Sequence, residues 1–222
     1  MEFYNLNNAT ARKKVGRYMQ TKGYVDGYDQ YAQNSMTELD SEKIPSVIPD
    51  LRFDLEKTAK LTDVVSASNI SARGFLINEK VKNIFESCKL SEHRYYDATI
   101  NVNGEIHKYY WLHLIFNDLS LIDFPNSSFY LSSFFDNQGN VPVQSVDDYF
   151  LKLKELTGNE FLFIFADKIK LLPTDDKFDL IVFPYIFGLR LRYLISSELK
   201  EKLEKEKVTG IDIEPQDILL PW

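Results

Sequence analysis

The chain has 222 residues, of which 44% are hydrophobic and 27% charged, so it can bury a core without disulfides or a structural metal. Its single cysteine, Cys88, excludes an internal disulfide and every multi-cysteine zinc site. The net charge of −7 permits attraction to a basic protein, and it disfavours direct nucleic-acid binding because no basic run is long enough to follow a phosphate backbone.

Neither a membrane span nor a secretory leader is expected. No stretch approaches the roughly 18 consecutive apolar residues that a transmembrane helix needs. The start of the chain lacks the basic, apolar and small-residue regions of a signal peptide. We therefore expect a cytoplasmic protein that does not bind membranes.

Residues 1–50 form a polar, tyrosine-rich segment, with one short strand expected at 3–6. Pro45 and Pro49 favour an extended connector over 44–50, because a proline disfavours helical conformation in the residue before it. Residues 51–222 have the pattern of an α+β domain. The sequence leaves open whether the first 50 residues belong to that domain.

Helices are expected after Asn78, after Ser145 and at 197–207, since Asn and Ser side chains cap helix starts. In the first of these helices, apolar side chains recur on one face at Val81, Ile84, Phe85 and Cys88. Cys88 is therefore interpreted as a core residue, because a free cysteine packs as a small hydrophobic side chain.

A hairpin is expected around Asn103–Gly104, with arms at 94–102 and 105–116. Further strands are expected at 51–56, 75–77, 120–124, 129–134, 161–165, 169–172, 180–183, 191–195 and 211–213. Strands and helices mix without a regular βαβ alternation. This order indicates an α+β fold built mainly on antiparallel sheet.

One segment is repeated in the sequence. Residues 75–82 resemble residues 193–200, and each copy reads as a strand, a polar cap and an amphipathic helix. We interpret them as two similar strand–helix units of one fold. The alternative is that any strand followed by a capped helix has this pattern.

The hairpin has two alternative registers. A two-residue loop, Asn103–Gly104, pairs Ile100 with His107, whereas a three-residue loop over 102–104 pairs even-numbered with even-numbered positions. We favour the second register because it gathers most apolar side chains on one face. The opposite face then carries Tyr95, Asp97, Thr99, His107, Tyr109, Trp111 and His113.

Polar and aromatic side chains of this kind are enriched at protein interfaces. We therefore predict that Asp97, Tyr109 and Trp111 contact a protein partner. The alternative is that this face lies beneath the first 50 residues or beneath a helix, where aromatic side chains stabilise a core.

No catalytic motif is recognised: the sequence has no glycine-rich phosphate loop, nucleophile elbow or zincin helix. His107 and His113 lie about 20 Å apart on one strand, too far to hold one metal ion. The acidic pairs Asp147–Asp148 and Asp175–Asp176 are interpreted as helix-start and turn residues. We expect a protein that is not an enzyme and needs no cofactor.

The order of several stretches resembles immunity proteins of bacterial polymorphic-toxin systems. The resemblance covers about residues 50–215, and its pieces are 53–57, 59–66, 74–77, 93–96, 109–113, 193–196 and 209–211. It implies a protein that binds a toxin made by the same cell and neutralises it by occlusion. The acidic charge suits a basic toxin. Two alternatives stay open: a small carboxylate-dependent hydrolase or transferase, and an adaptor with no toxin partner.

Overall fold

The computed structural model describes residues 2–41, 43–115, 119, 121–133, 136–156, 162–172, 178–183, 192–216 and 218–219. Within these ranges, twelve strands form three sheets, accompanied by four α-helices. Nearly all strand pairs are antiparallel. The predicted α+β class is therefore confirmed. The predicted pair Asp175–Asp176 and the ends of the strands predicted at 161–165 and 191–195 lie outside the described residues.

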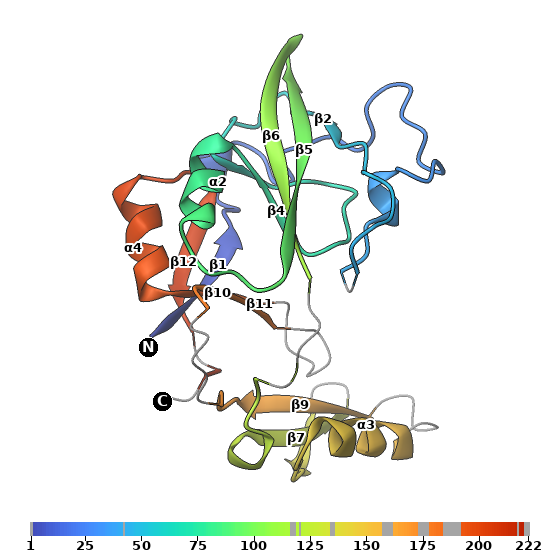
Figure 1. The fold of residues 1–222 in the computed structure, drawn as a ribbon, viewed down its shortest axis with the longest axis vertical. Coiled ribbons are helices and arrows are strands. Elements are labelled where there is room, and N and C mark those ends of the chain that lie inside the picture. The colour runs from blue at the N-terminus through green and yellow to red at the C-terminus, as the bar shows by residue number, and fades with distance from the viewer. Residues whose placement is uncertain are drawn as a thin grey trace.

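The central sheet has five strands in the order β2-β5-β6-β4-β3. Only β2 and β5 are parallel. Their bounds are β2 (Arg52–Asp54), β3 (Val64–Val65), β4 (Gly74–Ile77), β5 (His93–Val102) and β6 (Glu105–Leu114). The tip of the β5–β6 hairpin projects beyond the other elements at the top of the view in Figure 1.

The register favoured for this hairpin is wrong. Val102 pairs with Glu105 and Ile100 pairs with His107, so the loop is the two residues Asn103 and Gly104. Both have positive φ, 53° and 96°, which matches the tight turn whose twist suits a hairpin. The burial argument failed because both faces of this sheet are covered, so apolar side chains do not mark a single inner face.

A second sheet has the order β10-β11-β1-β12, and the strand expected at 3–6 is confirmed as part of β1. Its strands are β1 (Phe3–Asn8), β10 (Leu180–Phe183), β11 (Arg192–Ser196) and β12 (Ile211–Pro215). β1 therefore lies between strands from the far end of the chain. Helices α2 (Glu79–Glu86) and α4 (Ser197–Lys205) contact each other (Figure 1) and share one apolar cluster with both sheets.

Both strand–helix units have the predicted caps. The Asn78 side chain accepts a hydrogen bond from Val81 N at 3.2 Å, and the Ser196 side chain accepts one from Leu199 N at 3.1 Å. These bonds satisfy amides that the first helical turn leaves free. β4–α2 and β11–α4 are thus two copies of the same local structure.

Asp63 joins the first unit to the segment that follows the second. Its carboxylate accepts hydrogen bonds from Asn78 Nδ2, Lys80 Nζ and Thr209 N, each at 2.8 Å. Burial by itself raises the pKa of this carboxyl group, but the bonds from Lys80, Thr209 and Asn78 outweigh burial and lower it.

The third sheet has the order β8-β7-β9 and is shown at the bottom of Figure 1 with α3. Its elements are β7 (Ser128–Ser133), β8 (Asp136–Asn140), β9 (Leu162–Lys168) and α3 (Val146–Glu155). The predicted cap is confirmed, because Ser145 Oγ accepts from Asp148 N at 3.1 Å. The strand predicted at 120–124 is wrong: Ile122 makes an isolated bridge, and Phe124 begins a 3-10 helix whose second residue is Pro125.

Proline suits the first turn of a helix, where its missing N–H costs nothing. The two short helices that remain are α1 (Arg12–Val15) and η1 (Met36–Glu38). None of the helices in the described part of the chain is long and apolar enough to span a membrane.

Candidate partner-binding surface

Residues predicted to form one outward face lie on opposite faces of the central sheet. Tyr109 and Trp111 are each 4% exposed, on the same face as Tyr96 and Ile100. Asp97 is on the other face, and its side chain is 83% exposed. The prediction that the three share an exposed face is wrong, because the two-residue turn sets strand β6 one position away from the favoured register.

The face that carries Trp111 lies beneath the N-terminal segment, which was the alternative interpretation. Met36 is fully buried and Leu39 is 4% exposed, and both pack into the cluster that contains Tyr109 and Trp111. We call residues 23–50 the acidic cover. Its buried side chains hold it on the sheet through apolar contact.

Hydrogen bonds fix the shape of the acidic cover. Tyr28 Oη donates to Asp50 O at 3.0 Å and accepts from Met36 N at 2.5 Å. The Tyr24 ring stacks on Tyr28 with centroids 5.3 Å apart. The Ser35 side chain caps the 3-10 helix by accepting from Thr37 N. A loop without long regular structure is thereby given one conformation.

Two contacts fasten the other end of the cover, one to β6 and one to Arg73, the residue before β4. His113 Nε2 donates to Asp40 O at 2.7 Å, because a carbonyl oxygen can only accept. Ser41 Oγ accepts from Arg73 N at 3.0 Å. Burial lowers the pKa of His113, although the bond to Asp40 partly opposes this effect. His113 is therefore neutral in the folded protein near pH 7.

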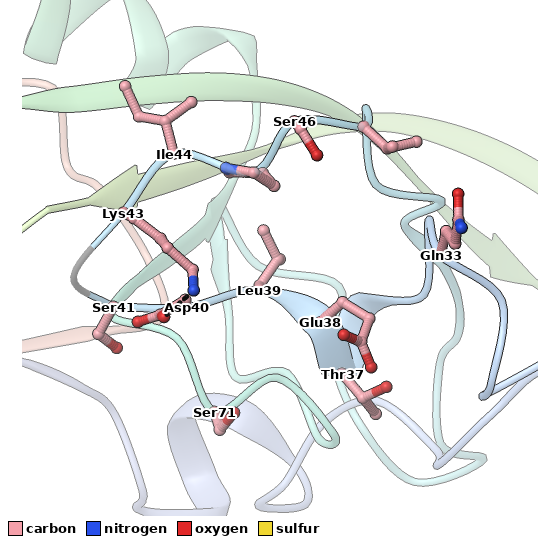
Figure 2. A pocket seen from close by; sticks show the side chains of 12 residues that line it. Gln33, Thr37, Glu38, Leu39, Asp40, Ser41, Lys43, Ile44, Ser46 and Ser71 are labelled. Atoms are coloured by element: carbon pink, nitrogen blue, oxygen red, sulfur yellow. Dashed lines mark ion pairs between the residues drawn. The ribbon is translucent and has the colours of Figure 1, made fainter.

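The cover lines an open polar pocket with a volume of about 710 Å³ (Figure 2). Its lining includes the carboxylates of Glu38 and Asp40, the ammonium group of Lys43, and the hydroxyl groups of Thr37, Ser41, Ser46 and Ser71. Lys43 Nζ lies 3.2 Å from Asp40 Oδ2, the ion pair drawn as a dashed line in Figure 2. Glu38 makes no ion pair with any described residue. The pocket therefore offers one free carboxylate and several hydroxyl groups.

The charge of the cover accounts for most of the charge of the chain. Residues 23–50 contain six Asp or Glu and one Lys, which gives −5 of the total −7. Of the described acids, Asp26, Asp29 and Glu38 are exposed and make no ion pair with the described residues. The net charge of the whole chain does not reveal this cluster, whereas a count of charges in short windows of the sequence does.

Large exposed apolar side chains lie on the same cover. Tyr31 is 87% exposed and Ile48 is 78% exposed. Interfaces combine an apolar or aromatic centre with a polar rim. Unpaired carboxylates, exposed apolar side chains and a pocket thus occur together on one anchored segment.

The remaining candidate residues do not form a reactive site in the described ranges. No group of three His, Cys, Asp or Glu side chains is arranged there to hold a metal ion. His107 Nε2 lies 3.7 Å from Glu105 Oε1, a carboxylate at the exposed end of the same strand. Cys88 is partly buried against the apolar cluster of α2, as expected, and its Sγ lies 3.3 Å from Lys202 Nζ.

Comparison with known proteins adds no assignment. No protein-family model matches the chain, and no curated protein matches its sequence.

Proposed function

We propose that the chain is a non-enzymatic, cytoplasmic immunity protein that binds a cognate bacterial toxin through the acidic cover and neutralises it by occlusion. The observation that carries the proposal is the surface of that cover. Three exposed, unpaired carboxylates lie on the same segment as Tyr31, Ile48 and the 710 Å³ pocket. The resemblance of residues 50–215 to immunity proteins supports the choice of a toxin as partner.

The charge of the cover suits a toxin with a basic binding surface. Complementary charge accelerates encounter, and the acceleration declines as salt screens it. A lysine or arginine of the toxin could enter the pocket beside Glu38, which has no cation of its own among the described residues. Charge-assisted hydrogen bonds to a carboxylate are about twice as strong as neutral ones.

Occlusion requires a slowly dissociating complex, which a preorganised binding surface favours. Met36 and Leu39 hold the cover in the core, and His113 fixes its far end. A preorganised surface loses less conformational entropy on binding, which favours high affinity. Exposed Tyr31 and Ile48 would become buried at the centre of the interface, where hot-spot residues concentrate.

The proposal is tested by affinity capture from the native cell, followed by expression of the captured polypeptide alone. We expect one stoichiometric partner that arrests growth by itself. The double variant Asp26→Lys/Glu38→Lys should capture much less of it. The matched control Glu155→Lys/Glu201→Lys reverses two exposed acids, on α3 and α4, and should capture as much as the wild type.

Other outcomes assign the protein to another class. A stoichiometric partner that is harmless when expressed alone indicates an adaptor. Equal capture by the wild type and the cover variant shows that the interface lies elsewhere.

A further inference from the structure

Two segments that are distant in sequence lie side by side next to the acidic cover. Lys22 N donates to Asp54 O at 2.8 Å, Glu56 N donates to Gln20 O at 2.8 Å, and Lys60 N donates to Val15 O at 2.9 Å. Residues 12–22 therefore lie alongside residues 54–60 in space. We call the surface formed by residues 12–22 and 57–60 the basic ribbon.

Gln20 holds the ribbon in place from inside the protein. It is fully buried, and its side-chain amide donates to Lys60 O at 2.7 Å and to Thr62 Oγ1 at 2.9 Å. Its Oε1 accepts from Ser66 N at 2.9 Å. Both polar atoms of this side chain are therefore hydrogen-bonded, one bond going to the other ribbon segment and the rest to Thr62 and Ser66 beneath it, which gives the surface a fixed shape.

The ribbon carries seven exposed cations and no acid of its own. They are Arg12, Lys13, Lys14, Arg17, Lys22, Lys57 and Lys60. Three of them pair with acids outside the ribbon: Lys14 with Asp212, Arg17 with Glu56 and Lys22 with Asp54. The other four make no ion pair with the described residues, and Lys60 Nζ donates a hydrogen bond to Lys13 O at 2.7 Å, so no described acid neutralises these four positive charges.

Exposed aromatic and apolar side chains lie among these cations. Tyr18 is 49% exposed and follows Arg17 directly. Met19 is 41% exposed and Leu61 is 37% exposed. A cationic track with an aromatic side chain on it is typical of surfaces that bind single-stranded nucleic acid, because phosphates contact the cations and bases stack on the ring.

We propose that the basic ribbon binds single-stranded nucleic acid, with Arg12, Lys13, Lys57 and Lys60 on phosphates and Tyr18 stacked on a base. Sequence analysis disfavoured nucleic acid because no single basic run is long enough, but folding joins two runs into one surface. The net charge of −7 does not prevent this, because the ribbon itself carries seven cations and no acid. This proposal does not depend on the toxin assignment.

Fluorescence anisotropy with a labelled 20-nucleotide oligo-dT, at salt concentrations from 50 to 200 mM, tests the proposal. Four phosphate contacts predict a slope of about −3 for log K against log salt, since single strands give about −0.7 per contact. Affinity should therefore fall about 50-fold across this range. Arg12→Gln/Lys13→Gln should weaken binding and make the slope shallower by about 1.4.

Two matched controls separate the ribbon from general charge effects. Arg94→Gln/Lys205→Gln removes two exposed cations on β5 and α4 and should leave the affinity and the slope unchanged. Tyr18→Ala should lower the affinity about 5- to 150-fold, whereas Tyr31→Ala on the acidic cover should not change it. Circular dichroism confirms that each variant is folded.

Three results overturn the proposal. They are no binding of the oligonucleotide at 50 mM salt, equal losses in the ribbon and control variants, and ribbon-dependent binding to phosphatidylserine vesicles without binding to the oligonucleotide. The last result assigns the ribbon to an anionic membrane surface instead.

Discussion

Truncation of Trp111 tests the register of the hairpin and the position of the acidic cover together. The side chain is 4% exposed and packs with Met36, Leu39 and Tyr109. A buried tryptophan removes about 150–250 Å² from water, which at about 25 cal/mol per Å² is about 4–6 kcal/mol. Measured Trp→Ala costs are about 3–5 kcal/mol. We expect Trp111→Ala to lower the free energy of unfolding by about 3–5 kcal/mol.

The assay is urea denaturation followed by far-ultraviolet circular dichroism, with a thermal melt as a second readout. In a domain of about 220 residues, each kcal/mol shifts Tm by about 2–4 °C, so Tm should fall by about 6–20 °C. Trp111→Phe is the matched variant. It keeps an aromatic ring and removes an indole N–H that has no hydrogen-bond partner among the described residues, so it should cost less than about 2 kcal/mol.

A different pattern refutes the reasoning. If Trp111→Ala unfolds at the same urea concentration as the wild type, the side chain is not in the core. If Trp111→Phe costs as much as Trp111→Ala, ring burial is not what stabilises this site.

Three further predictions concern single residues that join segments distant in the sequence. Gly210→Ala should lower the free energy of unfolding by at least about 2 kcal/mol in urea melts, because φ is +87° and an added Cβ would lie 1.9 Å from Val64 O. Asp63→Asn should be less stable than the wild type at pH 7, and the difference in stability should shrink as pH falls below about 4. The reason is that the pKa of Asp63 is lower in the folded than in the unfolded protein. The carboxylate therefore stabilises the fold above the unfolded pKa, and this stabilisation is lost as pH falls through the folded pKa. Urea midpoints at pH 7 and pH 3 check it, and a constant difference contradicts it. Gln20→Leu should cost about 2–4 kcal/mol, because it leaves the buried Ser66 N and the partly buried Lys60 O without their partners. A loss below about 1 kcal/mol argues against the role given to this amide.

Local structure was predictable from local signals. Asn78 and Ser145 cap their helices as expected, because a capping side chain bonds only to the next turn. The repeated strand–helix unit was visible for the same reason. The Asn103–Gly104 turn was also recognised, but its loop length was wrong, because burial on both faces of the sheet removed the signal used to choose between registers.

Placement of the candidate surfaces was not predictable in this way. The acidic cover lies on Trp111 through Met36 and Leu39, contacts that join residues more than 70 positions apart. The basic ribbon is formed by backbone hydrogen bonds between residues 15–22 and 54–60, and the buried Gln20 side chain adds bonds to Lys60 and Thr62. A contact made by one buried side-chain amide leaves no periodic pattern in the sequence.

A growth measurement tests most directly whether the acidic cover neutralises a toxin. Cells expressing the captured partner are made to co-express the wild-type chain, Asp26→Lys/Glu38→Lys, or the control Glu155→Lys/Glu201→Lys. We expect that the wild type and the control restore growth, whereas the cover variant, although folded, does not. Full rescue by the cover variant, or no rescue by the wild type, contradicts it.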